Sequence, residues 1–316
     1  MLSPIRKIIP SGAKVQRASA LPNVKESFIN TLVLPTERKG LEKDISRYTM
    51  LVYGREKIGK TTLFSLFPEA IFLATEPALK GIDVFCFNAE RGGVTDWRIM
   101  RKAVELLEQD RNVFKTVVID TADLAYDYCL DYVCETLGIE HPGKDSLGER
   151  DYGYSWREVA REFRTLVRRI EQTGRGVCFT SHVREEIVKP RFGEGYTIVG
   201  PSISGQGRKV IESIVDYYWY ADYIRDKSGE VKRVLICSGD DFVWAGSRPS
   251  PFTKRMPQFL PLDDENGYEI IKSAFEGKYK GISLDDISPS KQSKKPVVSF
   301  LERSKVLARA KTTFPG

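Results

Sequence analysis

Four residues have the spacing of a phosphate-binding loop, G-x-x-x-x-G-K-[ST]: Gly54, Gly59, Lys60 and Thr61. In such a loop, backbone N–H groups and the N-terminus of the following helix face a polyphosphate. Lys60 would reach the β- and γ-phosphates, and the Thr61 hydroxyl would ligate Mg²⁺. An apolar run precedes the loop and a helical pattern begins at Thr62, so the motif predicts binding of ATP or a similar nucleotide together with Mg²⁺.

Two carboxylates follow or end apolar runs and are candidates for the chemistry of hydrolysis. Asp120 closes the run 114–120 in the form of a Walker B acid that helps to hold Mg²⁺; the alternative is an aspartate that caps the next helix. Thr121 follows it, whereas the AAA+ pattern has a catalytic glutamate there. Glu76 follows the run 70–75. Because ligands bind at the carboxyl ends of parallel strands, we expect Glu76 to orient the attacking water; the alternative is a solvated loop residue.

A further apolar run, 176–181, ends at Ser181 and is followed by His182. A polar group at the end of such a strand can detect the γ-phosphate and pass its presence to the next segment. A lone histidine is more often structural, and that alternative stays open for His182.

Apolar runs alternate with amphipathic helical patterns along the chain. The strand-like runs are 48–53, 70–75, 82–87, 114–120, 176–181, 216–222, 231–237 and 241–245. The helical patterns are 62–67, 97–109, 124–137, 156–172 and 209–214. This alternation predicts an α/β fold with a mainly parallel central sheet flanked by helices. We expect an N-terminal arm over 1–47, the core over 48–285, and a basic linker with a C-terminal helix over 286–316.

Charge is unevenly distributed over the 316 residues. The formal net charge is +6, and both ends are basic while the middle is mildly acidic. Basic ends favour contacts with an anionic polymer, nucleic acid above all, although they can also serve only to keep a protein in solution. Five cysteines without a Cys-x-x-Cys pair indicate a reduced, cytoplasmic protein. No apolar run approaches the roughly 18 residues of a membrane span.

With these residues in view, the core resembles the RecA-like P-loop ATPases. The segment 72–79 (FLATEPAL) is similar to the RecA segment that carries the catalytic glutamate. The segment 179–182 (FTSH) lies where that family has a strand ending in a γ-phosphate-sensing glutamine, and His182 departs from it. The chain also resembles the Sak-type phage ATPases of single-strand annealing and recombination. This similarity covers roughly 48–275 and includes Lys57 in the loop and the segments DYGYSW (151–156) and AGSR (245–248).

The resemblance implies contact with single-stranded DNA through two flexible loops, matched here by 138–154 and 184–208. Cations neutralise phosphates and aromatic rings stack bases, and the second loop has both. Its DNA-binding candidates are Arg184, Lys189, Arg191, Phe192 and Tyr196. The alternative is an ordinary solvated loop. RecA-like sites are completed across subunits by a cation, so the resemblance also implies a homo-oligomer, ring or filament. The candidates for that cation are Arg208, Lys209 and Arg248.

Together these features predict a Mg²⁺-dependent, DNA-stimulated ATPase that binds single-stranded DNA in phage recombination or annealing, in the host cytoplasm. ATP would order the DNA-binding loops through Ser181 and His182, and hydrolysis would release DNA. Two alternatives stay open: a helicase or helicase-loading motor, and a nucleotide-gated scaffold that binds a protein partner. The C-terminal helix, 298–310, is a candidate contact for such a partner, for example a single-strand-binding protein.

Overall fold

The structure, a computed structural model, describes residues 33–77, 79–109, 113–188, 195–203, 205–283 and 287. The chain divides into two compact units, Met1–Leu41 and Glu42–Gly316. The described part of the first unit, 33–41, has no helix or strand. All elements below belong to the second unit. None of the described helices is long and apolar enough to cross a membrane.

One sheet organises the second unit. Its described strands are β1 (Thr49–Gly54), β2 (Ala70–Ala74), β3 (Phe85–Cys86), β4 (Thr116–Asp120), β5 (Gly176–Val188), β6 (Tyr196–Pro201), β7 (Tyr217–Arg225), β8 (Val231–Ile236), β9 (Gly246–Ser247) and β10 (Phe259–Pro261). The order β7-β1-β5-β4-β2-β3 is parallel throughout. β8 and β10 extend the sheet in antiparallel pairing beyond β7, β9 pairs with β7, and β6 pairs with β5. The α/β fold with a mainly parallel sheet is therefore as predicted.

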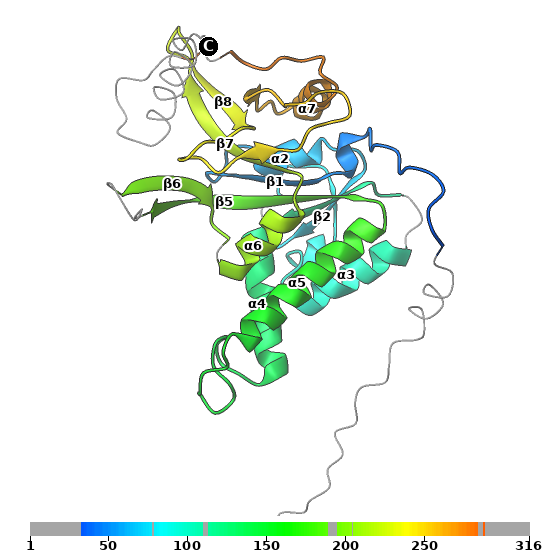
Figure 1. Cartoon of the computed structure of the whole chain (residues 1–316), viewed down its shortest axis with the longest axis vertical. Coiled ribbons are helices and arrows are strands. Elements are labelled where there is room, and N and C mark those ends of the chain that lie inside the picture. The colour runs from blue at the N-terminus through cyan, green and yellow to red at the C-terminus, as the bar shows by residue number, and fades with distance from the viewer. Residues whose placement is uncertain are drawn as a thin grey trace, which may run out of the picture. The chain divides into compact units, whose positions relative to one another are not determined.

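Helices cover both faces of this sheet (Figure 1). The described helices are α2 (Lys60–Ser65), α3 (Trp97–Gln109), α4 (Ala122–Leu137), α5 (Tyr154–Gln172), α6 (Gly205–Ile214) and α7 (Gly267–Phe275), with 3-10 turns η1 (Ile45–Arg47) and η2 (Ala89–Arg91). On one face, α3 to α6 bury a core that includes Trp97 and Phe163. On the other, α2 and α7 bury Phe64 and Phe275. Because both faces are covered, β1, β2 and β4 are buried along their whole length.

The stretch 184–208, predicted to be a flexible loop, is mainly regular structure. β5 continues past His182 to Val188, and β6 returns beside it, with Val183 opposite Pro201 and Val188 opposite Tyr196. Residues 189–194, at the tip, lie outside the described residues. The loop prediction is wrong for this stretch because the backbone groups of both arms pair with each other, and α6 begins soon afterwards.

The run 241–245 was predicted to be a strand and is instead a bend with one isolated bridge, between Val243 and Val199. The carboxylate of Asp240 accepts hydrogen bonds from the backbone N–H groups of Phe242 (2.8 Å) and Val243 (3.0 Å), which bends the chain. The short strand β9 lies just beyond. By contrast, 138–153 is irregular as expected, apart from one bridge between Lys144 and Arg150.

Candidate nucleotide site

The phosphate-binding loop connects the end of β1 to the start of α2. Gly54 must be a glycine because a Cβ there would lie 2.5 Å from the carbonyl oxygen of Ala221 in the neighbouring strand β7. Gly59 caps α2 with φ of 110°, a conformation that favours glycine. Lys57 also has positive φ, at 58°. The loop therefore curves around the N-terminus of α2, where backbone N–H groups are available to an anion.

Lys60 is buried and holds its ammonium group inside the loop. Its Nζ donates hydrogen bonds to the carbonyl oxygens of Gly54 (3.0 Å) and Arg55 (2.8 Å). Burial lowers the pKa of Lys60, and the nearby carboxylates, first among them Asp120, oppose that shift. Among the described residues, the hydrogen-bond partners of Lys60 Nζ are these two backbone carbonyl oxygens, and phosphate oxygens are stronger partners for an ammonium group.

Asp120 and Thr61 form the oxygen-rich corner of the site. The Thr61 hydroxyl donates to Asp120 Oδ2 (2.9 Å), and the Thr180 hydroxyl donates to Asp120 Oδ1. Burial raises the pKa of Asp120, while these two hydrogen bonds lower it. Hydroxyl and carboxylate oxygens are the hard ligands that Mg²⁺ prefers, and Mg²⁺ at phosphates needs only one or two of them. This donor set fits Mg²⁺, which when bound would neutralise charge on the phosphates.

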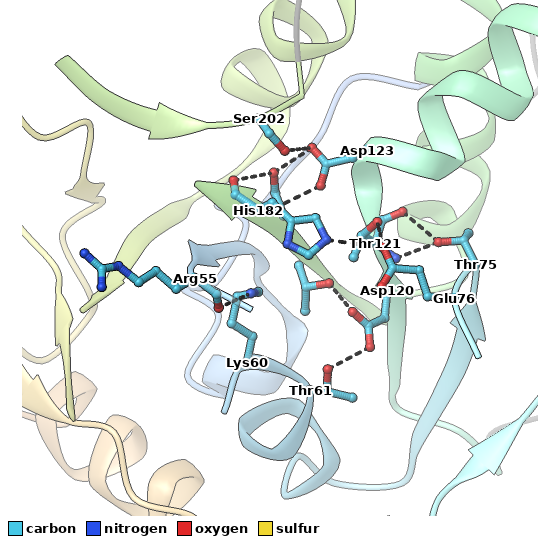
Figure 2. A network of polar contacts seen from close by, with 12 residues as sticks. Arg55, Lys60, Thr61, Thr75, Glu76, Asp120, Thr121, Asp123, His182 and Ser202 are labelled. Carbon is cyan, nitrogen blue, oxygen red and sulfur yellow. Dashed lines mark hydrogen bonds and ion pairs between the residues drawn. The ribbon is translucent and has the colours of Figure 1, made fainter. Parts of the chain in front are cut away.

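Glu76, just after β2, and His182, in the middle of β5, face each other (Figure 2). His182 Nε2 lies 3.3 Å from Glu76 Oε1, and the Thr121 hydroxyl lies 3.4 Å from the same oxygen. Thr75 positions Glu76 beside Asp120: Thr121 N donates to Thr75 Oγ1 (2.7 Å), and Thr75 N donates to Asp120 O (2.7 Å). Nδ1 of His182 is buried and has no hydrogen-bond partner in the described part of the chain. The ring is therefore anchored on the Glu76 side alone.

Asp123, in the first turn of α4, connects the middle of β5 to the residue that follows β6. Its carboxylate accepts hydrogen bonds from Ser181 Oγ (2.9 Å), His182 N (3.1 Å) and Ser202 Oγ (2.6 Å). Ser202 directly follows β6, so both arms of the β5–β6 hairpin are tied to α4 beside the Glu76–His182 pair (Figure 2). No motif in the sequence indicated this residue. An acid in the first turn of a helix was its only signal.

A cavity of about 580 Å³ joins these groups. Its lining includes the predicted residues Lys57, Gly59, Lys60, Thr61, Thr62, Glu76, Asp120 and His182. Ser181 is not among the lining residues, and its hydroxyl points to Asp123. Arg233 and Asp264, which no motif indicated, also line the cavity. The Arg233 guanidinium pairs with the carboxylate of Asp264 (2.6 and 3.0 Å) and donates to the carbonyl oxygen of Ile58 in the loop (3.2 Å).

Comparison with known families assigns the chain. Residues 46–249 match AAA_24, described as an AAA domain. The chain belongs to the AAA_24 family. This AAA_24 protein is therefore an AAA-type P-loop protein with an α/β core, and family and fold together indicate an NTPase. Thr121 still occupies the position after Asp120, and the acidic side chain beside Thr121 is that of Glu76, which follows the neighbouring strand β2.

Two known proteins are similar to the AAA_24 protein. The SPbeta prophage-derived uncharacterized protein YorG of Bacillus subtilis (strain 168) is 23% identical over 150 residues, which are 47% of this chain and 43% of YorG. The chain thus spans less than half the length of this relative. The KaiC-like protein PH0186 of Pyrococcus horikoshii OT3, known from a crystal structure, is 15% identical with a TM-score of 0.38 and covers 70% of this chain and 88% of that chain.

Of the other predicted residues of the AAA_24 protein, Arg184, Tyr196 and Arg248 are described and do not line the cavity. Arg184 is on the outer part of β5, with its side chain 54% exposed. Tyr196 opens β6 and packs edge-on against Phe242. Arg248 pairs with one carboxylate oxygen of Asp216 (3.1 Å), and the other oxygen accepts a hydrogen bond from the N–H of Thr49. Thr49 begins β1, so Arg248 lies near the end of β1 opposite to the phosphate-binding loop. Lys189, Arg191 and Phe192 lie outside the described residues.

Arg208 and Lys209 are neighbours in α6 with different surroundings. The Arg208 guanidinium pairs with Glu186 (3.2 Å) and Glu212 (3.0 Å) and lies over the ring of Trp244. Lys209 is exposed and has no ion pair within the described ranges. Arg208 is therefore committed to its own chain, whereas Lys209 is available to a neighbour.

Proposed function

We propose that this AAA_24 protein is a Mg²⁺-dependent ATPase that binds single-stranded DNA and acts in phage-type recombination or annealing. The observation that carries the ATPase part is the convergence of three groups on one cavity. Lys60 supplies the cation, Thr61 with Asp120 supplies the Mg²⁺ ligands, and Glu76 lies across from them. No other described cavity combines a phosphate-binding loop with two carboxylates.

In this proposal Glu76 orients the attacking water and His182 reports on the γ-phosphate. A carboxylate within reach of the terminal phosphate can accept the proton of the water as it attacks. His182 Nε2 contacts the Glu76 carboxylate. When a γ-phosphate is bound, Glu76 turns toward the attacking water, and the imidazole of His182 loses or changes this contact. The histidine is thus a positioning residue that couples the phosphate to β5.

The DNA-binding part rests on the β5–β6 hairpin. The hairpin begins at His182, and the Asp123 carboxylate accepts hydrogen bonds from His182 N and Ser202 Oγ, one in β5 and the other just after β6. A change in the position of His182 at the γ-phosphate can therefore move the hairpin directly. The outer part of the hairpin displays Arg184. Lys189, Arg191 and Phe192 belong to the undescribed tip and remain candidates for phosphate and base contacts. The prophage origin of YorG supports the phage context.

We also propose a homo-oligomer in which one subunit supplies a cation to the next. Of the three candidates, Arg208 is held by Glu186 and Glu212, while Lys209 is exposed on the same helix. Lys209 is therefore the preferred candidate, and Arg248 the second. The C-terminal segment 286–316, outside the described residues except for Ile287, is the proposed contact for a single-strand-binding protein.

ATP hydrolysis measured with and without single-stranded DNA, duplex DNA and RNA tests this function. The expected result is Mg²⁺-dependent turnover, increased most by single-stranded DNA. Replacement of Arg184, Lys189 and Arg191 by alanine should weaken binding of the strand and flatten its salt dependence. ATP-dependent unwinding of a duplex would instead indicate a motor. Nucleotide binding without turnover on any polymer would indicate a scaffold.

A further inference from the structure

Helix α5 carries a row of arginines on the side opposite its buried residues. The buried positions include Val159, Phe163, Leu166, Val167 and Ile170. Arg157, Arg161, Arg164 and Arg168 follow one another at spacings of four, three and four residues, which aligns them along one helical face. We call these four residues the arginine stripe. At 1.5 Å per residue, the stripe is about 16 Å long.

The acidic residues of α5 leave most of the stripe uncompensated. Glu162 accepts a hydrogen bond from Trp97 Nε1 (3.0 Å), and Glu171 accepts one from Thr49 Oγ1 (2.9 Å). Glu158 pairs with Arg161. Across the described ranges, no carboxylate forms an ion pair with the other three arginines of the stripe.

This row does not stabilise the fold. Arg157 and Arg161, like Arg164 and Arg168, are like charges four residues apart, an arrangement that destabilises a helix. None of the four is among the buried side chains. The stripe therefore costs stability and contributes no core packing, which points to a ligand with the opposite charge.

Two exposed aromatic rings lie at the N-terminal end of the stripe. Tyr152 is 96% exposed and Tyr154 is 47% exposed. The guanidinium of Arg157 lies 6.0 Å from the centre of the Tyr154 ring. Asp151 fixes this turn, since its carboxylate accepts from the backbone N–H groups of Gly153 (2.8 Å) and Ser155 (2.9 Å). The rings are thus held in solvent by an ordered turn, beside the first guanidinium of the row.

We propose that the arginine stripe, with Tyr152 and Tyr154, is a binding surface for single-stranded nucleic acid, in addition to the β5–β6 hairpin. The inference rests on the proposed function and adds a second contact surface to it. Guanidinium groups in a row bind successive phosphates, and exposed rings stack on unpaired bases. An acidic protein surface could form ion pairs with the arginines, but it would not explain the exposed rings of Tyr152 and Tyr154. Figure 1 shows α5 in the helical layer and the hairpin extending from the sheet.

Anisotropy of a fluorescein-labelled oligothymidylate, titrated over a range of salt concentrations, tests this surface. Each phosphate contact with a single strand contributes about 0.7 to the slope of log K against log salt. Arg164→Ala/Arg168→Ala should therefore lower the slope by about 1.4 and weaken binding about 25-fold at ~0.1 M salt. Tyr152→Ala should weaken binding by roughly fivefold or more with the slope unchanged. The matched control is Lys254→Ala/Arg255→Ala, which removes two exposed charges elsewhere and should change affinity less than about twofold.

The outcomes separate this inference from the function on which it rests. If the wild-type protein does not bind the oligonucleotide, the proposed function fails and this surface fails with it. If wild type binds and the stripe variant equals the control, the stripe alone is overturned. If the stripe variant loses duplex binding to the same extent, the stripe is assigned to duplex nucleic acid. If it loses polyglutamate binding and keeps oligonucleotide binding, the stripe is assigned to an acidic protein. Either result overturns the single-strand inference. The unfolding free energy of each variant excludes misfolding; for the stripe variant it is expected to be no lower than that of wild type, because like-charge repulsion is removed. Arg164→Lys/Arg168→Lys, which keeps the charge, should retain most of the affinity.

Discussion

Asp123 is expected to couple the nucleotide cavity to the hairpin, and Asp123→Asn tests this coupling. The carboxylate accepts three hydrogen bonds, from two serine hydroxyls and the N–H of His182. The asparagine amide has one acceptor oxygen, and its NH₂ group would meet donors. Hydrogen bonds to a charged group are worth roughly 1.5–3 kcal/mol each, and Asp123 is only half-buried. We therefore expect a loss of about 2 kcal/mol in the free energy of unfolding.

The functional effect should be larger on DNA stimulation than on basal turnover. Lys60, Thr61, Asp120 and Glu76 do not depend on Asp123 for a hydrogen bond, so DNA-free hydrolysis should remain within about threefold of wild type. Loss of about 1.4 kcal/mol of coupling would reduce the stimulation by single-stranded DNA roughly tenfold.

Ser202→Ala provides a graded control for Asp123→Asn. It removes one of the three bonds and should give a smaller loss of the same kind. The assay is steady-state ATP hydrolysis with and without DNA, with chemical denaturation of each variant. A folded Asp123→Asn variant that keeps full DNA stimulation would refute the coupling route.

Three further changes test the site itself. Lys60→Ala should weaken ATP binding at least 100-fold by calorimetry, because the buried ammonium group is the cation inside the loop. Retained affinity would remove Lys60 from that role. Burial raises the pKa of Asp120, so the metal-free folded protein holds that proton more tightly than the unfolded chain. Its contribution to stability is therefore present at low pH and is lost as pH rises above about 4, the ordinary aspartate value. Asp120→Asn should remove this pH dependence from the unfolding free energy and abolish Mg²⁺-dependent hydrolysis; an unchanged pH profile would contradict the reasoning. Arg233→Ala should raise the KM for ATP roughly tenfold with kcat nearly unchanged, because Arg233 supports the loop through Ile58 O and takes no part in the chemistry. A fall in kcat alone would contradict this.

Sequence patterns predicted the elements that a clean period or a motif marks. The helical pattern 97–109 matches α3 (Trp97–Gln109), whose buried positions recur with the helical period. The order of strands, however, is not encoded by any local pattern. β5 lies between β1 and β4, so Thr180 reaches Asp120 from a strand sixty residues later in the chain. A polar residue inside an apolar run was the only sign that Thr180 needed a buried partner.

The β5–β6 hairpin and the cavity residues Arg233 and Asp264 could not be predicted from local sequence patterns either, because they too depend on pairing between distant segments. Arg184, Glu185 and Glu186 were predicted to belong to a flexible DNA-binding loop, because a run of charged residues is unusual in a strand. They extend β5 because β6 pairs with them, and that pairing depends on residues ten or more positions away. Arg233 and Asp264 come to the loop through β8 and the segment after β10, in the antiparallel extension of the sheet. No motif places those elements beside Gly59.

In the proposed function, the cavity hydrolyses ATP through Glu76, and single-stranded DNA controls the rate. The most direct measurement is phosphate release by wild type and Glu76→Gln at saturating ATP and Mg²⁺, with and without a single-stranded oligonucleotide. Wild type should turn over and respond to the strand. Glu76→Gln should bind ATP with similar affinity while its turnover falls by roughly 100-fold or more in both conditions. Undiminished phosphate release by Glu76→Gln, or wild-type turnover that ignores the strand, would contradict the claim.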